Sequence, residues 1–287
     1  MRTPRVVQLL SIFVISLGLE ACGGMPPTTL TGNWLLAGSR VPAAYPIVST
    51  SLFIQGNAVT GELVIYTQCT KGIFTATSTS SVAIKGTIGN DGTFQASGTV
   101  SGIATSNTLS VSLSGNSPTL ASPSVWTGAY SVTGGVCGVD QTANFTATAI
   151  APMTGTYIGS PADPGTVPQP FGANAVVSLQ ITQGAPTLVT RSTDDGGVST
   201  FLIPLTANFT IANSPCSISL STTGASIPST VHGDSFELSF LLPGSGGGGI
   251  ISGTLSEPTA NSFSANLNSL SNAIGCPGAA NYTFTRQ

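Results

Sequence analysis

The feature that most constrains this chain is an internal repeat, in which four landmarks occur twice and in the same order. The first landmark is a Gly followed two places later by an aromatic residue, and the last two are cysteines. The paired landmarks are residues 30–34 and 153–157, residues 51–56 and 178–184, Cys69 and Cys216, and Cys137 and Cys276. Chance could explain any one match, but the shared order and cysteine placement indicate a duplicated unit.

The repeat divides the chain near residues 151–152 into two copies, residues 30–150 and residues 153–287. A chain of 287 residues is long enough for two domains of ordinary size, each with its own core. Charged residues make up only 6% of the chain, but 40% of the residues are hydrophobic, which favours folded cores over disorder. We therefore expect two related domains in tandem.

Each copy has the pattern of short strands and turns. Apolar and polar residues alternate in residues 93–100 and 109–113, so one face of each strand could pack on a core. Residues 90–92 (Asn-Asp-Gly) precede these runs, and Asp-Gly is favoured in tight hairpins. In the second copy, residues 235–240 and 250–255 flank a Gly-rich hairpin loop. After residue 29, no segment shows sustained helical periodicity, so we predict an all-β fold of antiparallel barrels or sandwiches.

Residues 32–34 (Gly-Asn-Trp) and 155–157 (Gly-Thr-Tyr) resemble the Gly-x-Trp start of lipocalin-type barrels. In that family the aromatic ring plugs one end of the barrel, so the resemblance implies this role for Trp34 and Tyr157. A barrel also suits the composition. Pairing the first strand with the last hides the edges that a charge-poor surface cannot guard with Lys or Glu.

The first residues have the pattern of a bacterial export signal. Arg2 and Arg5 give a positive start, and the apolar stretch over residues 6–19 is too short for a comfortable membrane span. Residues 19–22 (Leu-Glu-Ala-Cys) resemble the bacterial lipobox. The resemblance implies a signal peptide at residues 1–21 that is cleaved off, and a lipid on Cys22.

The same resemblance implies a location for the mature protein. Residues 22–29, which contain Gly and Pro, would form a flexible tether, and the lipid on Cys22 would make the membrane a partner. Gly23 occupies the place where an Asp commonly retains lipoproteins at the inner membrane, so the resemblance favours the outer membrane. The alternative is an ordinary cleavage site at residues 21–23, which would release a secreted or periplasmic protein.

The other four cysteines predict one disulfide in each copy. An even number of cysteines in an exported chain favours disulfides. If each copy folds alone, Cys69 pairs with Cys137 and Cys216 with Cys276, although the sequence by itself permits three pairings. Each closed loop would stabilise its copy by about 4 kcal/mol. Metal binding is disfavoured, because no two cysteines are closely spaced and the chain has a single His.

Few residues suggest catalysis. A net charge of -3 with only seven Lys and Arg residues excludes nucleic acid as a partner. His232 is the sole imidazole, and residues 232–234 (His-Gly-Asp) are expected to form a solvated turn before a strand that begins near Ser235. Common serine-nucleophile and nucleotide-binding signatures are missing. We therefore predict no catalytic residue, no metal site and no cofactor.

Aromatic residues are the remaining candidates for a site. They could line a ligand pocket, but in small barrels a place in the core is the commoner role. The candidates are Trp34, Tyr66, Trp126, Tyr130 and Tyr157. We expect a non-enzymatic envelope lipoprotein with a structural or binding role, whose partner is an apolar ligand or an envelope protein. The alternatives are a surface-exposed adhesin and an envelope glycan hydrolase, which a pocket with His232 and a serine, or with two carboxylates, would favour.

Overall fold

The structure is a computed structural model, and part of the chain falls outside its description. It describes residues 30–37, 48–71, 74–101, 108–119, 122–135, 140–162, 171–172, 174–191, 198–243, 248–255, 257–276 and 281–287. The predicted signal peptide, the tether, Cys22 and Cys137 lie outside these residues. Cys69 belongs to a described strand, but its side chain lies outside the description. The lipid on Cys22 and the bridge between Cys69 and Cys137 therefore stay predictions.

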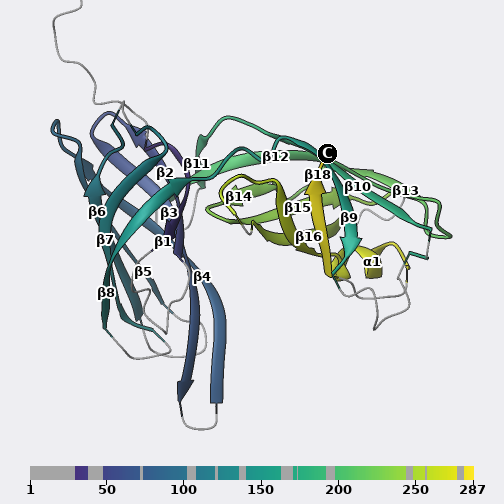
Figure 1. Ribbon diagram of the computed structural model, residues 1–287, viewed down its shortest axis with the longest axis horizontal. Helices are drawn as coiled ribbons and strands as arrows, with labels where there is room; N and C mark the ends of the chain where they lie inside the picture. Colours follow the sequence, from purple (N-terminus) through teal and green to yellow (C-terminus); the bar gives the residue numbers. More distant parts are fainter. Residues whose placement is uncertain are drawn as a thin grey trace, which may run out of the picture.

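The first copy is a closed antiparallel barrel of eight strands, in which each strand pairs with the next along the chain. Pairing of β1 with β8 closes the barrel and places Trp34 opposite Ala149. Strands β3 and β4 continue as a paired hairpin beyond the barrel (Figure 1). The strands are β1 (Gly32–Ala37), β2 (Val48–Gln55), β3 (Ala58–Lys71), β4 (Phe74–Ile88), β5 (Thr93–Ser101), β6 (Thr108–Asn116), β7 (Val125–Gly134) and β8 (Gln141–Ala149).

Aromatic side chains fill the interior of the first barrel, because alternate residues of each strand point inward. The ring of Trp126 lies among three others, with centroids 5.9 Å away for Trp34, 5.0 Å for Phe94 and 4.9 Å for Phe145. All three pairs meet edge to face, a favourable aromatic geometry. Glycine makes room for them, since a Cβ on Gly128 would lie 2.7 Å from the Phe145 ring.

The second copy is also a closed antiparallel barrel of eight strands. Its ring runs β9, β10, β12, β14, β15, β16, β17 and β18, and the register of β10 with β12 completes it. The extra strands β11 and β13 pair with the two ends of the long β12. The elements are β9 (Gly155–Pro161), β10 (Val176–Gln183), β11 (Thr187–Arg191), β12 (Val198–Ala212), β13 (Ile218–Ser221), β14 (Thr230–His232), β15 (Ser235–Leu241), β16 (Gly248–Leu255), β17 (Ser262–Asn266), α1 (Asn268–Ala273) and β18 (Asn281–Arg286).

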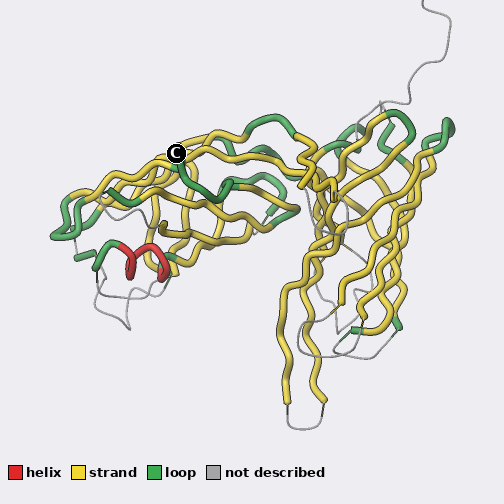
Figure 2. The backbone as a smooth tube through the Cα atoms, turned by 180° about the vertical axis from the view of Figure 1, so that it is seen from behind, coloured by secondary structure: helices red, strands yellow, loops and turns green. Residues whose placement is uncertain are grey.

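The tandem barrels confirm the predicted all-β fold and decide for barrels over sandwiches. Each barrel encloses its own cluster of buried apolar side chains. Figure 2 shows how little helix there is: α1 is the one red segment of the described chain. No helix among the described residues has both the length and the apolar character needed to cross a membrane.

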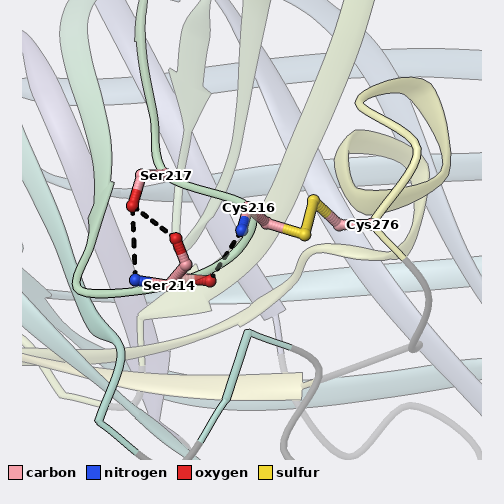
Figure 3. Close-up of a disulfide and its surroundings, with 4 residues drawn as sticks. All are labelled: Ser214, Cys216, Ser217 and Cys276. Atoms are coloured by element: carbon pink, nitrogen blue, oxygen red, sulfur yellow. Dashed lines mark hydrogen bonds between the residues drawn. A yellow bond between two sulfur atoms is a disulfide. The ribbon is translucent and has the colours of Figure 1, made fainter.

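Cys216 and Cys276 form a disulfide, which is the pairing expected for the second copy (Figure 3). Cys216 follows β12, and its backbone N–H donates a hydrogen bond of 3.0 Å to the hydroxyl of Ser214. Cys276 follows α1, ahead of the last strand. With Cα atoms 6.0 Å apart, the bridge ties the end of a long strand to the segment that precedes the final strand of the same barrel.

Candidate functional site at the contact between the barrels

The turn between β14 and β15 lies against the outer wall of the first barrel. It consists of Gly233 and Asp234 together with His232, the last residue of β14, and it contacts side chains of β1, β2 and β3. Gly233 has a φ of 56°, and a Cβ there would lie 2.7 Å from the Cβ of Ser49. Glycine is therefore required twice over at this position, for its left-handed backbone and for the close approach of the other barrel.

Two buried serines of β2 receive the backbone of this turn. The N–H of Gly233 donates to the hydroxyl of Ser51 at 2.7 Å and also lies 3.1 Å from Oδ1 of Asn33. The Ser51 hydroxyl in turn donates to the same Asn33 oxygen at 2.6 Å. Ser49 accepts the N–H of Asp234 at 3.1 Å. Every polar group named here has a partner, as buried polar groups require.

Asp234 is the buried carboxylate at the centre of the contact, with only 5% of its surface exposed. Its Oδ1 accepts hydrogen bonds from the Ser49 hydroxyl at 2.5 Å and from the Tyr66 hydroxyl at 3.2 Å. Burial raises the pKa of Asp234 above its ordinary value, although the two hydroxyls act in the opposite direction. Burial, followed by the nearby charge of Asp234, also raises the pKa of Tyr66.

A close contact of a histidine with a carboxylate lies beside this cluster. Nδ1 of His232 is 2.8 Å from Oε2 of Glu62 in β3, and each side chain is about four-fifths buried. The other ring nitrogen, Nε2, lies 3.1 Å from the hydroxyl of Thr230. The expectation of a solvated turn is therefore wrong for residues 232–234. The turn itself is present, but the neighbouring barrel removes it from water.

A row of carboxylate, imidazole and hydroxyl is the arrangement used in nucleophilic catalysis. Such a row can act only if a substrate reaches the hydroxyl. Here Glu62, His232 and Thr230 form such a row, but Thr230 is only 9% exposed, which limits the access of a substrate to its hydroxyl. Ser49 is fully buried, and both of its hydrogen bonds go to Asp234. In the described residues, no three His, Cys, Asp or Glu side chains are grouped so that they could hold a metal ion.

Apolar contacts flank the polar cluster. Leu35 of β1 and Phe53 of β2 point out of the first barrel and pack against the core cluster of the second. The short connection between the barrels is held from both sides, since the Ile150 N–H donates to Asn33 and the Ala151 N–H donates to Pro258. The two barrels therefore meet through a built interface with polar and apolar parts.

The sequence also pointed to aromatic residues, and the structure buries four of them in two different cores. Trp34, Trp126 and Tyr130 belong to the first barrel, and Tyr157 belongs to the second. The Trp34 indole donates to the carbonyl of Leu30 at 2.8 Å. Burial raises the pKa of Tyr130 to about 12. These residues do not converge on a site, and of the candidates Tyr66 alone takes part in the contact between the barrels.

Tyr157 is held firmly in the second core. Its hydroxyl donates to the carbonyl of Ala260 at 3.0 Å and accepts from Nη2 of Arg286 at 2.8 Å. The Arg286 guanidinium also lies 5.4 Å from the centroid of the Tyr157 ring and donates to the carbonyl of Pro152. The aromatic residue at the start of the second copy therefore anchors the connection between the barrels as well as the core.

Comparisons with known proteins add little to this geometry. A scan against protein-family models and a search of curated proteins found no match. Among solved structures, the chain is similar to a double mutant of the vaccine antigen transferrin binding protein B from Haemophilus parasuis, with 10% sequence identity and a TM-score of 0.22. The match covers 90% of this chain but 58% of that one, less than two thirds of its length. So loose a superposition supports no functional inference.

The residues of the contact that the sequence did not single out are Asn33, Ser49, Ser51, Glu62 and Asp234. A signal was available in the neighbouring strands. A strand with one face in water alternates, but β1 contains the run 34–36 (Trp-Leu-Leu) and β2 the run 52–54 (Leu-Phe-Ile). Consecutive apolar residues indicate that both faces of a strand are buried.

Proposed function

We propose that this protein is a lipid-anchored envelope protein without enzymatic activity, whose joined barrels present their outer walls to a partner protein. The proposal rests on the observation that the side chains best suited to catalysis are paired at the contact between the barrels. Across the contact between the barrels, the sole imidazole lies beside Glu62, the Asp234 carboxylate accepts the Ser49 hydroxyl, and the Ser51 hydroxyl accepts the N–H of Gly233. Groups committed to such a joint are not free to turn over a substrate.

The barrel interiors favour an external partner over an enclosed ligand. Trp34 and Trp126 occupy the first barrel with Phe94 and Phe145, and Tyr157 packs against Phe263 with ring centroids 4.8 Å apart in the second. Close packing of rings leaves little room for a second molecule. A partner would then be bound by the outer walls, which also suits a protein tethered by a lipid on Cys22.

The anchor is tested by intact mass spectrometry and fractionation of cells that produce the wild-type chain or the Cys22→Ser variant. The wild-type protein should carry an acylated N-terminal cysteine and sediment with membranes. The Cys22→Ser variant should lack the lipid and lose the membrane association. A wild-type protein that is cleaved, unacylated and soluble would contradict the proposed anchoring.

The row of Glu62, His232 and Thr230 favours a second candidate function, an envelope hydrolase. The two functions differ in what purified envelope glycans would show. A hydrolase would release soluble fragments, and it would lose this activity in His232→Ala and in Thr230→Val but keep part of it in Thr230→Ser. Our proposal expects no fragments from the wild-type protein under any of these conditions.

A further inference from the structure

A groove of about 230 Å³ lies on the outer wall of the second barrel. Its floor comes from β15 and β16, and its side comes from the connection between β13 and β14. The lining residues are Gly224, Ala225, Ser226, Ile227, Ser239, Phe240, Leu241, Gly248, Gly249 and Ile250.

The groove exists because β14 is too short to cover its neighbour. β14 has three residues and pairs with only the first three residues of β15, Ser235–Glu237, so the rest of β15 has no strand on that side among the described residues. The connection crosses there instead, and the hydroxyl of Ser229 accepts the N–H of Ser239 at 2.9 Å. An irregular segment cannot match the pleat of a strand, so a hollow remains between the two.

The walls of the groove are apolar. Ile227 is 51% exposed and Leu241 is 46% exposed, which makes them the two most exposed large apolar side chains in the described residues. Ile250 lies opposite Ser239 in the register of β15 with β16, on the same outer face. Apolar side chains that gather at a hollow indicate a contact surface more strongly than scattered ones do.

The floor holds an unpaired polar group. Ser239 occupies an outward-facing position of β15 and is nevertheless only 4% exposed, and its hydroxyl has no hydrogen-bond partner among the described residues. A buried hydroxyl without a partner destabilises a protein by about 1–3 kcal/mol. A ligand that hydrogen-bonds to Ser239 would remove this penalty.

We propose that the groove binds one branched aliphatic side chain of an extended, uncharged peptide segment from a partner protein, with a peptide group hydrogen-bonded to Ser239. The inference rests on the proposed partner-binding function and names the chemistry of the partner. No lining residue is ionisable, so a ligand charge would be buried without a counter-charge. The volume is below the roughly 300–1,000 Å³ of pockets that take whole small molecules and suits a single side chain.

The test uses the purified protein with 13C-labelled Ile and Leu methyl groups and follows the addition of acetyl-Thr-Leu-Thr-amide by NMR. The methyl signals of Ile227, Leu241 and Ile250 should shift, and those of buried Leu63 in the first barrel should not. Acetyl-Thr-Gly-Thr-amide, which lacks the side chain, should leave the same signals unchanged. Ser239→Ala should weaken binding about five- to tenfold, in line with the loss of one hydrogen bond.

Two matched variants test whether the methyl shifts come from binding in the groove or from exposed apolar side chains in general. Ile227→Asp should abolish the shifts of Leu241 and Ile250, whereas Val176→Asp, at a residue 43% exposed on β10 and absent from the groove lining, should preserve them. Failure of the leucine peptide to shift the groove signals would overturn the proposal. So would shifts caused by octanoate and not by the peptide, because the groove would then hold an acyl chain. Neither result bears on the anchoring by Cys22, which mass spectrometry and fractionation test separately.

Discussion

Two equivalent turns of the barrels have opposite surroundings. Each connects the fourth and fifth strands of its ring, residues 89–92 in the first barrel and 232–234 in the second. Asp91 lies in water, and its carboxylate accepts hydrogen bonds from the N–H and hydroxyl of Thr93, two residues away. Asp234 is buried and accepts its hydrogen bonds from Ser49 and Tyr66 of the other barrel.

The carboxyl pKa values of the two turns move in opposite directions. The local hydrogen bonds from Thr93 lower the pKa of Asp91 below its ordinary value, whereas burial raises that of Asp234. Both turns join adjacent strands with an Asp and a Gly. The turn of the second copy is a joint because it faces the wall of the first barrel, whereas the turn of the first copy faces water.

The largest effect is expected from Gly233→Ala, compared with Gly56→Ala. Both glycines have a φ near 60°, so each substitution should lose about 1–2 kcal/mol of stability from the left-handed backbone. A Cβ at residue 56 meets nothing within 4 Å, whereas one at residue 233 meets Ser49. Overpacking there should add about 1–3 kcal/mol. Urea unfolding measures the difference, and equal losses would show that the turn is not tightly docked.

The next effect is expected from Asp234→Ala, compared with Asp91→Ala. Removal of the Asp234 carboxylate leaves the buried hydroxyl of Ser49 and the hydroxyl of Tyr66 without their acceptor, so about 2–3 kcal/mol of stability should be lost. Asp91→Ala removes only a solvated turn interaction and should have a much smaller effect. Thermal unfolding compares the two, and the joint would be unimportant if Asp91→Ala had the larger effect.

A smaller effect is expected in the pH dependence of stability. The pKa of Asp234 is raised in the folded state above its ordinary value of 3.8, which applies in the unfolded state. The folded state therefore binds this proton more tightly than the unfolded state does. The stability that this carboxyl contributes is therefore complete below 3.8 and is lost as the pH rises through the folded pKa. Asp234→Asn does not titrate, so its stability relative to the wild type should increase as the pH rises through the folded pKa of Asp234. Urea midpoints from pH 3 to pH 7 test this, and a difference that stays constant would contradict it.

The smallest effect is expected for the contact of Glu62 with His232. Both side chains retain about a fifth of their exposure, so the pair should contribute about 0.5–1 kcal/mol and weaken at high salt. A double-mutant cycle with Glu62→Gln and His232→Gln isolates this coupling. Strict additivity at low salt would show that the two side chains are neighbours without an energetic link.

Much of the fold could be predicted from the sequence, because it is written in local patterns. The repeated Gly-x-aromatic starts and the alternation in residues 93–100 carry through to two closed barrels, and the expected pairing of Cys216 with Cys276 is present in the second. The match of residues 51–56 with residues 178–184 holds less well in the structure. Gly32 faces Leu52 in the first barrel, whereas Gly155 faces Ile181 in the second, two residues beyond the sequence match. A shift of two keeps every side chain on its own face, so the pattern could not reveal it.

The site was harder to predict, because it depends on which outer surfaces meet. Residues 232–234 indicate a turn, and nothing local in them distinguishes a turn in water from one against another barrel. Ser49 and Ser51 have the composition of solvated strand residues, and only their apolar neighbours Leu35 and Phe53 suggest a covered face. Contacts between residues about 180 positions apart leave no periodic signal in a single sequence.

The joint is tested most directly by electron–electron distance measurements between spin labels on genetically encoded residues at exposed Ser97 and Thr283, one in each barrel. The native disulfide then stays intact. A turn that locks the barrels together predicts one narrow distance distribution for the wild type and for Gly56→Ala, and a broad one for Gly233→Ala. A broad distribution in the wild type, or an equally narrow one in Gly233→Ala, would contradict it.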